Sequence, residues 1–73
     1  MLSNVENFLG SKIKAARENA GLSLEELAKQ GCISAKQLEQ IESGGDAYFY
    51  SAAIKLASAK KIAKILGVVE DGY

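Results

Sequence analysis

The 73-residue sequence contains no histidine and a single cysteine, Cys32. An internal disulfide needs two cysteines, and the common zinc patterns combine several cysteines and histidines, so no disulfide and no such metal site is predicted. No cofactor is predicted either. We interpret Cys32 mainly as a small packed side chain, with a redox-sensing thiol as the alternative. A lone cysteine fits a reducing, cytoplasmic setting.

The sequence also lacks a long apolar run and an excess of charge of either sign. No stretch approaches the roughly 20 apolar residues of a membrane-spanning helix, and no secretory hydrophobic segment is recognisable. A cytoplasmic protein without a membrane segment in this chain is therefore expected. Nine basic residues balance nine acidic ones. Because autonomous nucleic-acid-binding domains are commonly basic, this balance argues against that function.

Catalytic machinery is missing as well. The sequence has no phosphate-binding glycine loop and no nucleophile beside an evident base, so an enzyme is not predicted. A chain of this length buries only about 60% of the surface that its unfolded form exposes, which suffices for one modest core. We expect one domain over residues 1–73, folded over about 5–68, with frayed ends at 1–4 and 69–73.

Two helix start signals of the same kind dominate the middle of the chain. Ser23 is followed three residues later by Glu26, and Ser34 in the same way by Gln37. Each pair is a capping box, in which the serine and the later side chain satisfy each other's backbone N–H groups, and each has apolar residues placed as a hydrophobic staple. The sequence therefore predicts two short helices, over about 24–30 and 35–43, joined by a sharp turn at 31–33.

Apolar spacing predicts a further helix on each side of this pair. Before it, apolar residues recur every three or four positions from Val5 until Gly21 ends the helix, and Gly10 is expected to fray this helix before Ser11. After it, Asp46 or Ser51 can cap a helix that Gly67 ends, with an apolar stripe at Ala52, Leu56, Ala59, Ala63 and Leu66. The predicted fold is all-α.

The segment from Ile13 to Gly44 reads I-x-x-x-R-x-x-x-G-L-S-x-x-E-L-A, then S-x-x-x-L-x-x-I-E-x-G. It resembles the helix-turn-helix domain of phage repressors and Cro-like (XRE-type) proteins, and residues 62–68 extend the similarity. The resemblance implies a compact lambda-repressor-like domain of four to five helices with a central helix-turn-helix. It also implies a bacterial or phage transcription regulator that binds double-stranded DNA.

The resemblance assigns roles to particular residues. The helix over 35–43 would read bases in the major groove, where glutamine can pair with adenine and lysine with guanine. A solvated or protein-contacting helix face is the alternative. The implied base-reading residues are Ala35, Lys36, Gln37 and Gln40; the implied phosphate contacts are Lys12, Lys14, Ser23 and Ser34; and Arg17 is expected to form a structural ion pair with Glu42, with a phosphate contact as its alternative.

Three features depart from the repressor pattern. Leu24 stands where many DNA-binding members carry a glutamine that holds the backbone. Cys32 stands where a glycine is usual, which requires a positive φ at a cost on the order of 1 kcal/mol. An aromatic insert, residues 46–54, lengthens the connection to the last helix.

Leu24 and the insert are similar to a second branch of the superfamily, the cytoplasmic domains of RodZ-like proteins, which bind the bacterial actin homologue. This similarity implies a protein-binding adaptor that uses the insert or the last helix. Its contact patch would comprise Tyr48, Phe49, Tyr50 and Ile54, although core packing of the three aromatics is the simpler interpretation. DNA binding, the favoured hypothesis, would require a homodimer on a two-fold site. No small-molecule ligand is predicted.

Overall fold

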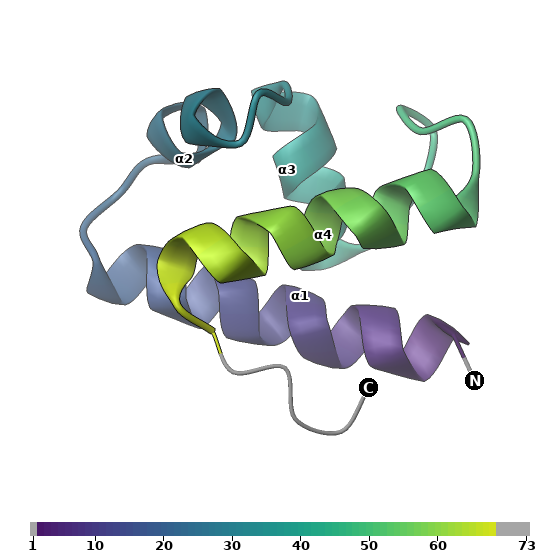
Figure 1. Ribbon diagram of the computed structural model, residues 1–73, viewed down its shortest axis with the longest axis horizontal. Helices are drawn as coiled ribbons and strands as arrows, with labels where there is room; N and C mark the ends of the chain where they lie inside the picture. Colours follow the sequence, from purple (N-terminus) through teal and green to yellow (C-terminus); the bar gives the residue numbers. More distant parts are fainter. Residues whose placement is uncertain (1, 69–73) are drawn as a thin grey trace.

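The computed structural model describes the backbone of residues 2–68 and the side chains of residues 9–68. This part of the chain forms four helices and no strand: α1 (Leu2–Asn19), α2 (Leu24–Gln30), α3 (Ala35–Ser43) and α4 (Ala52–Leu66) (Figure 1). The all-α prediction is confirmed, and α2 and α3 have the expected bounds. Within the described residues, no helix has the length and apolar character needed to span a membrane.

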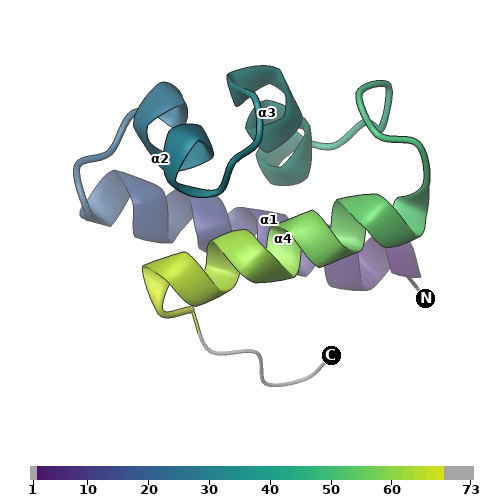
Figure 2. The ribbon, with the colours of Figure 1, turned by 45° about the horizontal axis from the view of Figure 1, so that its top comes forward.

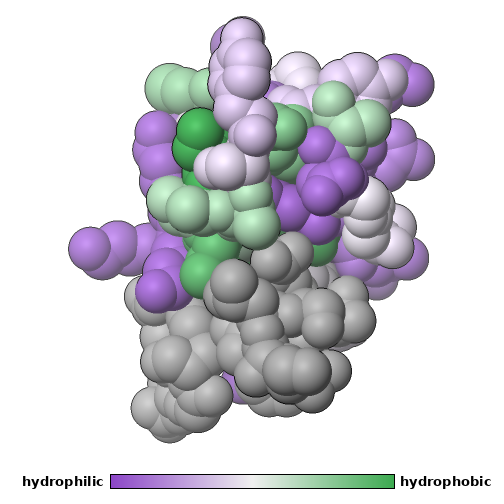
Figure 3. All heavy atoms as spheres, turned by 90° about the vertical axis from the view of Figure 1, so that its right-hand side faces the viewer, coloured by the Kyte–Doolittle hydropathy of each residue, from purple (hydrophilic) through white to green (hydrophobic). Residues whose placement is uncertain are grey.

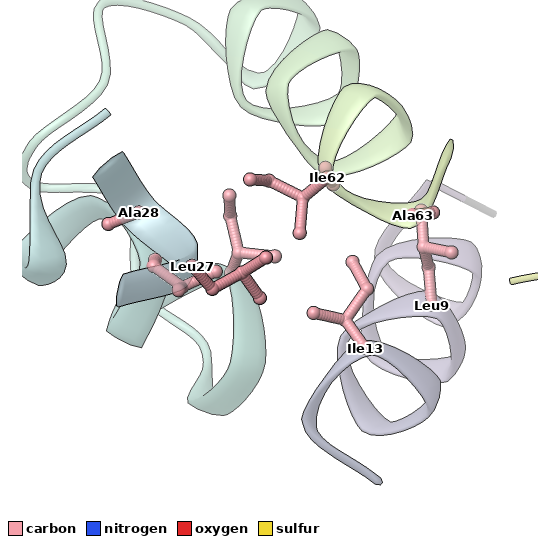
Figure 4. Packing of buried hydrophobic residues seen from close by; sticks show 9 residues of the cluster. Leu9, Ile13, Leu27, Ala28, Ile62 and Ala63 are labelled. Atoms are coloured by element: carbon pink, nitrogen blue, oxygen red, sulfur yellow. The ribbon is translucent and has the colours of Figure 1, made fainter. Parts of the chain in front are cut away.

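The helices form two layers around one core. α1 and α4 lie side by side, and α2 and α3 lie across them on one side (Figures 1 and 2). Ile13 from α1, Leu27 from α2 and Ile62 from α4 converge in the centre (Figure 4). All four helices contribute to the buried cluster of Leu9, Ile13, Leu27, Ala28, Leu38, Ile41, Ala59, Ile62 and Ala63.

The first helix differs from the expected one at Gly10. It runs from Leu2 to Asn19, and Gly10 does not interrupt it. Gly10 is buried against α3, and a Cβ at this position would collide with the carbonyl oxygen of Ile41. Its role is to let the α1 and α3 backbones approach closely. The predicted fraying of residues 69–73 lies outside the described residues.

Three helices end in the same hydrogen-bonded motif. At the end of α2, Ile33 N–H donates to Ala28 O (3.0 Å) and Cys32 N–H to Lys29 O (3.2 Å), the two bonds of a Schellman motif. Equivalent bonds close α1 around Gly21 and α4 around Gly67, both of which have positive φ as this motif requires. The helix ends predicted at these two glycines are confirmed.

The turn of the helix pair places a cysteine where the other two ends have glycine. Cys32 has φ of 59°, the positive value anticipated from the sequence, but its side chain is exposed, so its interpretation as a packed residue is wrong. Gly31 is buried instead, and a Cβ there would collide with Ile62 Cδ1. Contact with α4 therefore requires the glycine one position earlier than in the repressor pattern.

The last helix is continuous from its cap. Ser51, and not Asp46, is the N-cap of α4, with its hydroxyl accepting from Ile54 N–H (3.2 Å). Ala52, expected to join the apolar stripe, is exposed, whereas Lys55 is buried. Lys55 Nζ donates a hydrogen bond to Gly45 O (2.6 Å), so this buried lysine binds the loop that precedes α4.

Candidate functional site

Both helices of the central pair begin with a complete capping box. At α2, Ser23 Oγ accepts from Glu26 N–H (3.1 Å), and Glu26 Oε1 accepts from Ser23 N–H (2.8 Å). At α3, Ser34 and Gln37 form the same two bonds at 3.1 and 3.0 Å. Hydrogen bonding to Ser23 lowers the pKa of Glu26 because it favours the ionised carboxylate. The backbone N–H of Ser23 has the larger effect and its side chain the smaller one.

A two-point ion pair sets the position of α3 on α1. Arg17 Nε and Nη2 donate to the Glu42 carboxylate at 2.7 and 3.0 Å, and the third nitrogen, Nη1, donates to Leu22 O at 2.9 Å. The Glu42 side chain is only 3% exposed and that of Arg17 12%. Hydrogen bonding to Glu42 raises the pKa of Arg17, against a lowering by burial. One guanidinium thus joins α1, α3 and the segment before α2.

The outward face of α3 carries the residues implied in base reading. Lys36 is exposed, whereas Ala35, Gln37 and Gln40 are half-buried. Leu38 and Ile41, on the opposite face, are buried in the core. The apolar face and the ion pair therefore leave the polar side of α3 directed away from α1 and α4.

The two glutamines on this face bind the backbone of the aromatic insert. Gln37 Nε2 donates to Tyr48 O (3.0 Å), and Gln40 Oε1 accepts from Tyr48 N–H (3.0 Å). Two successive turns of α3 therefore hold both polar backbone groups of one residue. The sequence contained no signal for this contact, because a glutamine three residues from another is equally suited to a solvated helix face.

These two bonds, the bond from Lys55 Nζ to Gly45 O and one bond within the segment define a loop, residues 45–50, that lies beside α3 (Figure 2). Phe49 N–H donates to Asp46 O (3.1 Å), which closes a turn, and the half-buried Phe49 ring packs against the core. Tyr48 and Tyr50 point into solvent, with exposures of 53% and 98%. Core packing of the aromatics is thus correct for Phe49 and wrong for both tyrosines.

The surface on this side of the molecule is mixed in character. Apolar and polar side chains lie interspersed in the view of Figure 3. Ile54, at the start of α4, is 47% exposed, so three of the four residues in the predicted contact patch are at the surface and Phe49 is the exception. An open hollow of about 310 Å³ is lined by the consecutive residues 47–50 and is simply the bend of the loop.

The residues implied in phosphate binding come from three places. Lys12, half-buried, and Lys14, exposed, lie on α1, while Ser23 and Ser34 cap α2 and α3. Each serine oxygen accepts a backbone hydrogen bond, which leaves its hydroxyl proton available to a partner. Leu24, the departure from the repressor pattern, is half-buried and packs against the core.

Two capped helices meeting at a tight turn, with the second anchored by its apolar face, define a helix-turn-helix protein. A family model described as a helix-turn-helix domain matches residues 10–73, and the chain belongs to this family. Domains of this family are typically non-enzymatic. Membership in the family suggests, at a coarse level, a DNA-binding regulator. No curated protein and no solved structure gives a significant match.

Proposed function

We propose that this chain is a sequence-specific DNA-binding domain of a cytoplasmic, repressor-like (XRE-type) transcription regulator from a bacterium or phage, and that α3 enters the major groove. The observation that carries the proposal is the anchoring of α3. The Arg17–Glu42 pair and the buried Leu38 and Ile41 hold it rigidly while its polar face stays outside. A helix presented in this way can dock in a groove at little conformational cost.

The first turn of α3 offers suitable base contacts. Lys36 is exposed and can donate to guanine O6 and N7, and Ala35 can pack on a thymine methyl group. Gln37 and Gln40 would have to give up their bonds to Tyr48 before they could reach a base edge. For the phosphates we propose the implied set of Lys12, Lys14, Ser23 and Ser34.

A domain of this size contacts few base pairs, so useful specificity requires two copies. We therefore propose a homodimer on a two-fold operator with half-sites about one DNA turn, roughly 10 base pairs, apart. Because only two members of the proposed phosphate-binding set, Lys12 and Lys14, are charged, each copy neutralises few phosphates. The salt dependence of its binding should accordingly be shallower than that of strongly basic domains, since the slope follows the number of counterions released.

The direct test is selection of the purified protein on a random duplex library at two salt concentrations, with the oligomeric state measured alongside. A palindromic enriched site whose affinity falls with salt supports the proposal. Failure to enrich any sequence contradicts it.

A matched pair of lysine variants then places the contact on α3. We expect Lys36→Ala to lose about 1 to 3 kcal/mol of base discrimination on the selected site. Lys61→Ala removes the same charge from an exposed position on α4, outside the proposed DNA contacts, and should bind like wild type. Equal losses in both variants would indicate a general charge effect and not base reading by α3.

The exposure of Tyr50 and Ile54 favours a second candidate function, a RodZ-like adaptor that binds another protein. Burial of such groups stabilises protein interfaces. In this case the duplex selection gives no enriched site. A partner isolated from the source cells should then bind Ile54→Ser and Tyr50→Ser at least tenfold more weakly, about 1.4 kcal/mol, and should bind Lys36→Ala normally.

A further inference from the structure

The bonds between α3 and Tyr48 use the polar groups that base reading would need. A glutamine that reads adenine donates its amide N–H to N7 and accepts from N6 with its amide oxygen. Gln37 already uses its oxygen for Ser34 N–H and its nitrogen for Tyr48 O, and Gln40 uses its oxygen for Tyr48 N–H. In this arrangement both side chains serve the loop.

We propose that Gln37 and Gln40 are positioning residues, and that the 45–50 loop they hold extends the DNA-binding surface of α3. Within this surface the phenol groups of Tyr48 and Tyr50 donate hydrogen bonds to backbone phosphates. The inference rests on the proposed function, DNA binding by α3, and assigns to the aromatic insert a role in it.

Three observations support a fixed contact surface. The loop is held to α3 at Tyr48, to α4 through Lys55 at Gly45, and to the core through Phe49. Ordering it on binding therefore costs little entropy. Although the backbone of the loop is anchored, the side chains of both tyrosines remain in solvent, and Tyr50 is 98% exposed.

The charge of the chain explains why phenols suit the phosphate role. With nine basic and nine acidic residues, the domain is not electrostatically attracted to DNA as a whole. Neutral donors, including tyrosine hydroxyls, form a regular part of protein–phosphate contacts. Such donors release no counterion, so their contribution to affinity does not depend on salt in the way that a lysine contribution does.

The positioning role is tested with two substitutions of one residue. Gln40→Ala removes the acceptor for Tyr48 N–H, whereas Gln40→Glu keeps an acceptor there and removes the amide donor that adenine would need. In the free protein we expect hydrogen exchange of the Tyr48 amide to become at least about tenfold faster in Gln40→Ala and to stay close to wild type in Gln40→Glu. Unchanged exchange in Gln40→Ala would overturn the anchoring.

Measurements of DNA binding distinguish a positioning role of Gln40 from base reading by Gln40. If Gln40 positions the loop, Gln40→Ala weakens binding to the selected site and to random duplex by the same factor and leaves the preferred sequence unchanged. Loss of discrimination at one base pair, about 5- to 150-fold, would show that Gln40 reads a base and overturn the proposal. Tighter binding by Gln40→Ala would also overturn it, because the loop would then be masking α3.

The tyrosine contacts are tested by removal of single hydroxyl groups. Tyr50→Phe and Tyr48→Phe should each weaken binding to any duplex by about two- to tenfold, with the salt slope and the thermal midpoint unchanged. Wild-type affinity in both variants would overturn the phosphate contacts while Lys36→Ala could still establish DNA binding by α3. If wild type itself binds no duplex, the proposed function fails first, and the exposed tyrosines belong to a protein interface.

Discussion

Removal of Arg17 is expected to destabilise this domain strongly. Arg17→Ala deletes three donors at once, two to Glu42 and one to Leu22 O. The Glu42 carboxylate, 3% exposed, would be left in the protein without its partner. Breaking a buried ion pair in this way typically costs about 3 to 5 kcal/mol.

That loss is large beside the stability available. At roughly 0.05 to 0.15 kcal/mol per residue, a chain of this length is stable by about 4 to 11 kcal/mol. In a domain of this size each kcal/mol moves the thermal midpoint by about 4 to 8 °C. We therefore expect Arg17→Ala to melt at least about 12 °C below wild type, as followed by circular dichroism, with urea titration as a second measure.

The double variant Arg17→Met/Glu42→Met is the control. It removes both charges and keeps apolar volume, so it should recover most of the loss, because a well-packed apolar pair is often as stable as a buried ion pair. A favourable coupling energy in the corresponding cycle would show that the pair acts as a unit. The reasoning is refuted if Arg17→Ala unfolds within about 1 kcal/mol of wild type, since that is the range of an exposed ion pair.

Three further predictions concern the backbone and one titrating group. Cys32→Gly should stabilise the domain by up to about 1 kcal/mol in a thermal melt, because glycine adopts the positive φ without steric cost; a destabilised variant would contradict this. Gly10→Ala should destabilise by about 1 to 3 kcal/mol in spite of its better helix propensity, because the new Cβ meets the Ile41 carbonyl, while Ser11→Ala, exposed on the same helix, should not. The pKa of Glu26 is lowered on folding, so its contribution to stability is present above its ordinary value of 4.5 and is lost as the pH falls through the lower, folded value. Glu26→Gln keeps an acceptor and cannot titrate, so urea titrations should show a weaker acid dependence than wild type; identical profiles would reject the assignment.

The central helices were predictable because their start signals are local. The capping boxes at Ser23 and Ser34 involve side chains and N–H groups within one helical turn, and both form as the sequence predicts. The positive φ of Cys32 followed from the resemblance, because repressor-like proteins usually carry a glycine at this position. The Arg17–Glu42 partnership, 25 residues apart, followed from the resemblance and not from local rules.

Positions that depend on contacts between distant segments were misjudged or missed. Gly10 was interpreted by its helix propensity, which depends on neighbours in the sequence. Its environment is instead set by the backbone of α3, which is distant in the sequence. Cys32 was expected to pack, yet the turn directs its side chain into solvent and places Gly31 against Ile62. The bonds from α3 to Tyr48 were not anticipated at all.

The sequence by itself determined the helix-turn-helix: where its two helices begin and end, and which of their faces are apolar. These properties depend on interactions over three or four residues, which are written into the order of the amino acids. The tertiary structure alone decided how the outward face of α3 is used, by folding the aromatic insert back onto it. Its two glutamines hold Tyr48, and Tyr50 is left in solvent, because hydrogen-bond partners eight and eleven residues apart are chosen by the path of the loop and not by spacing.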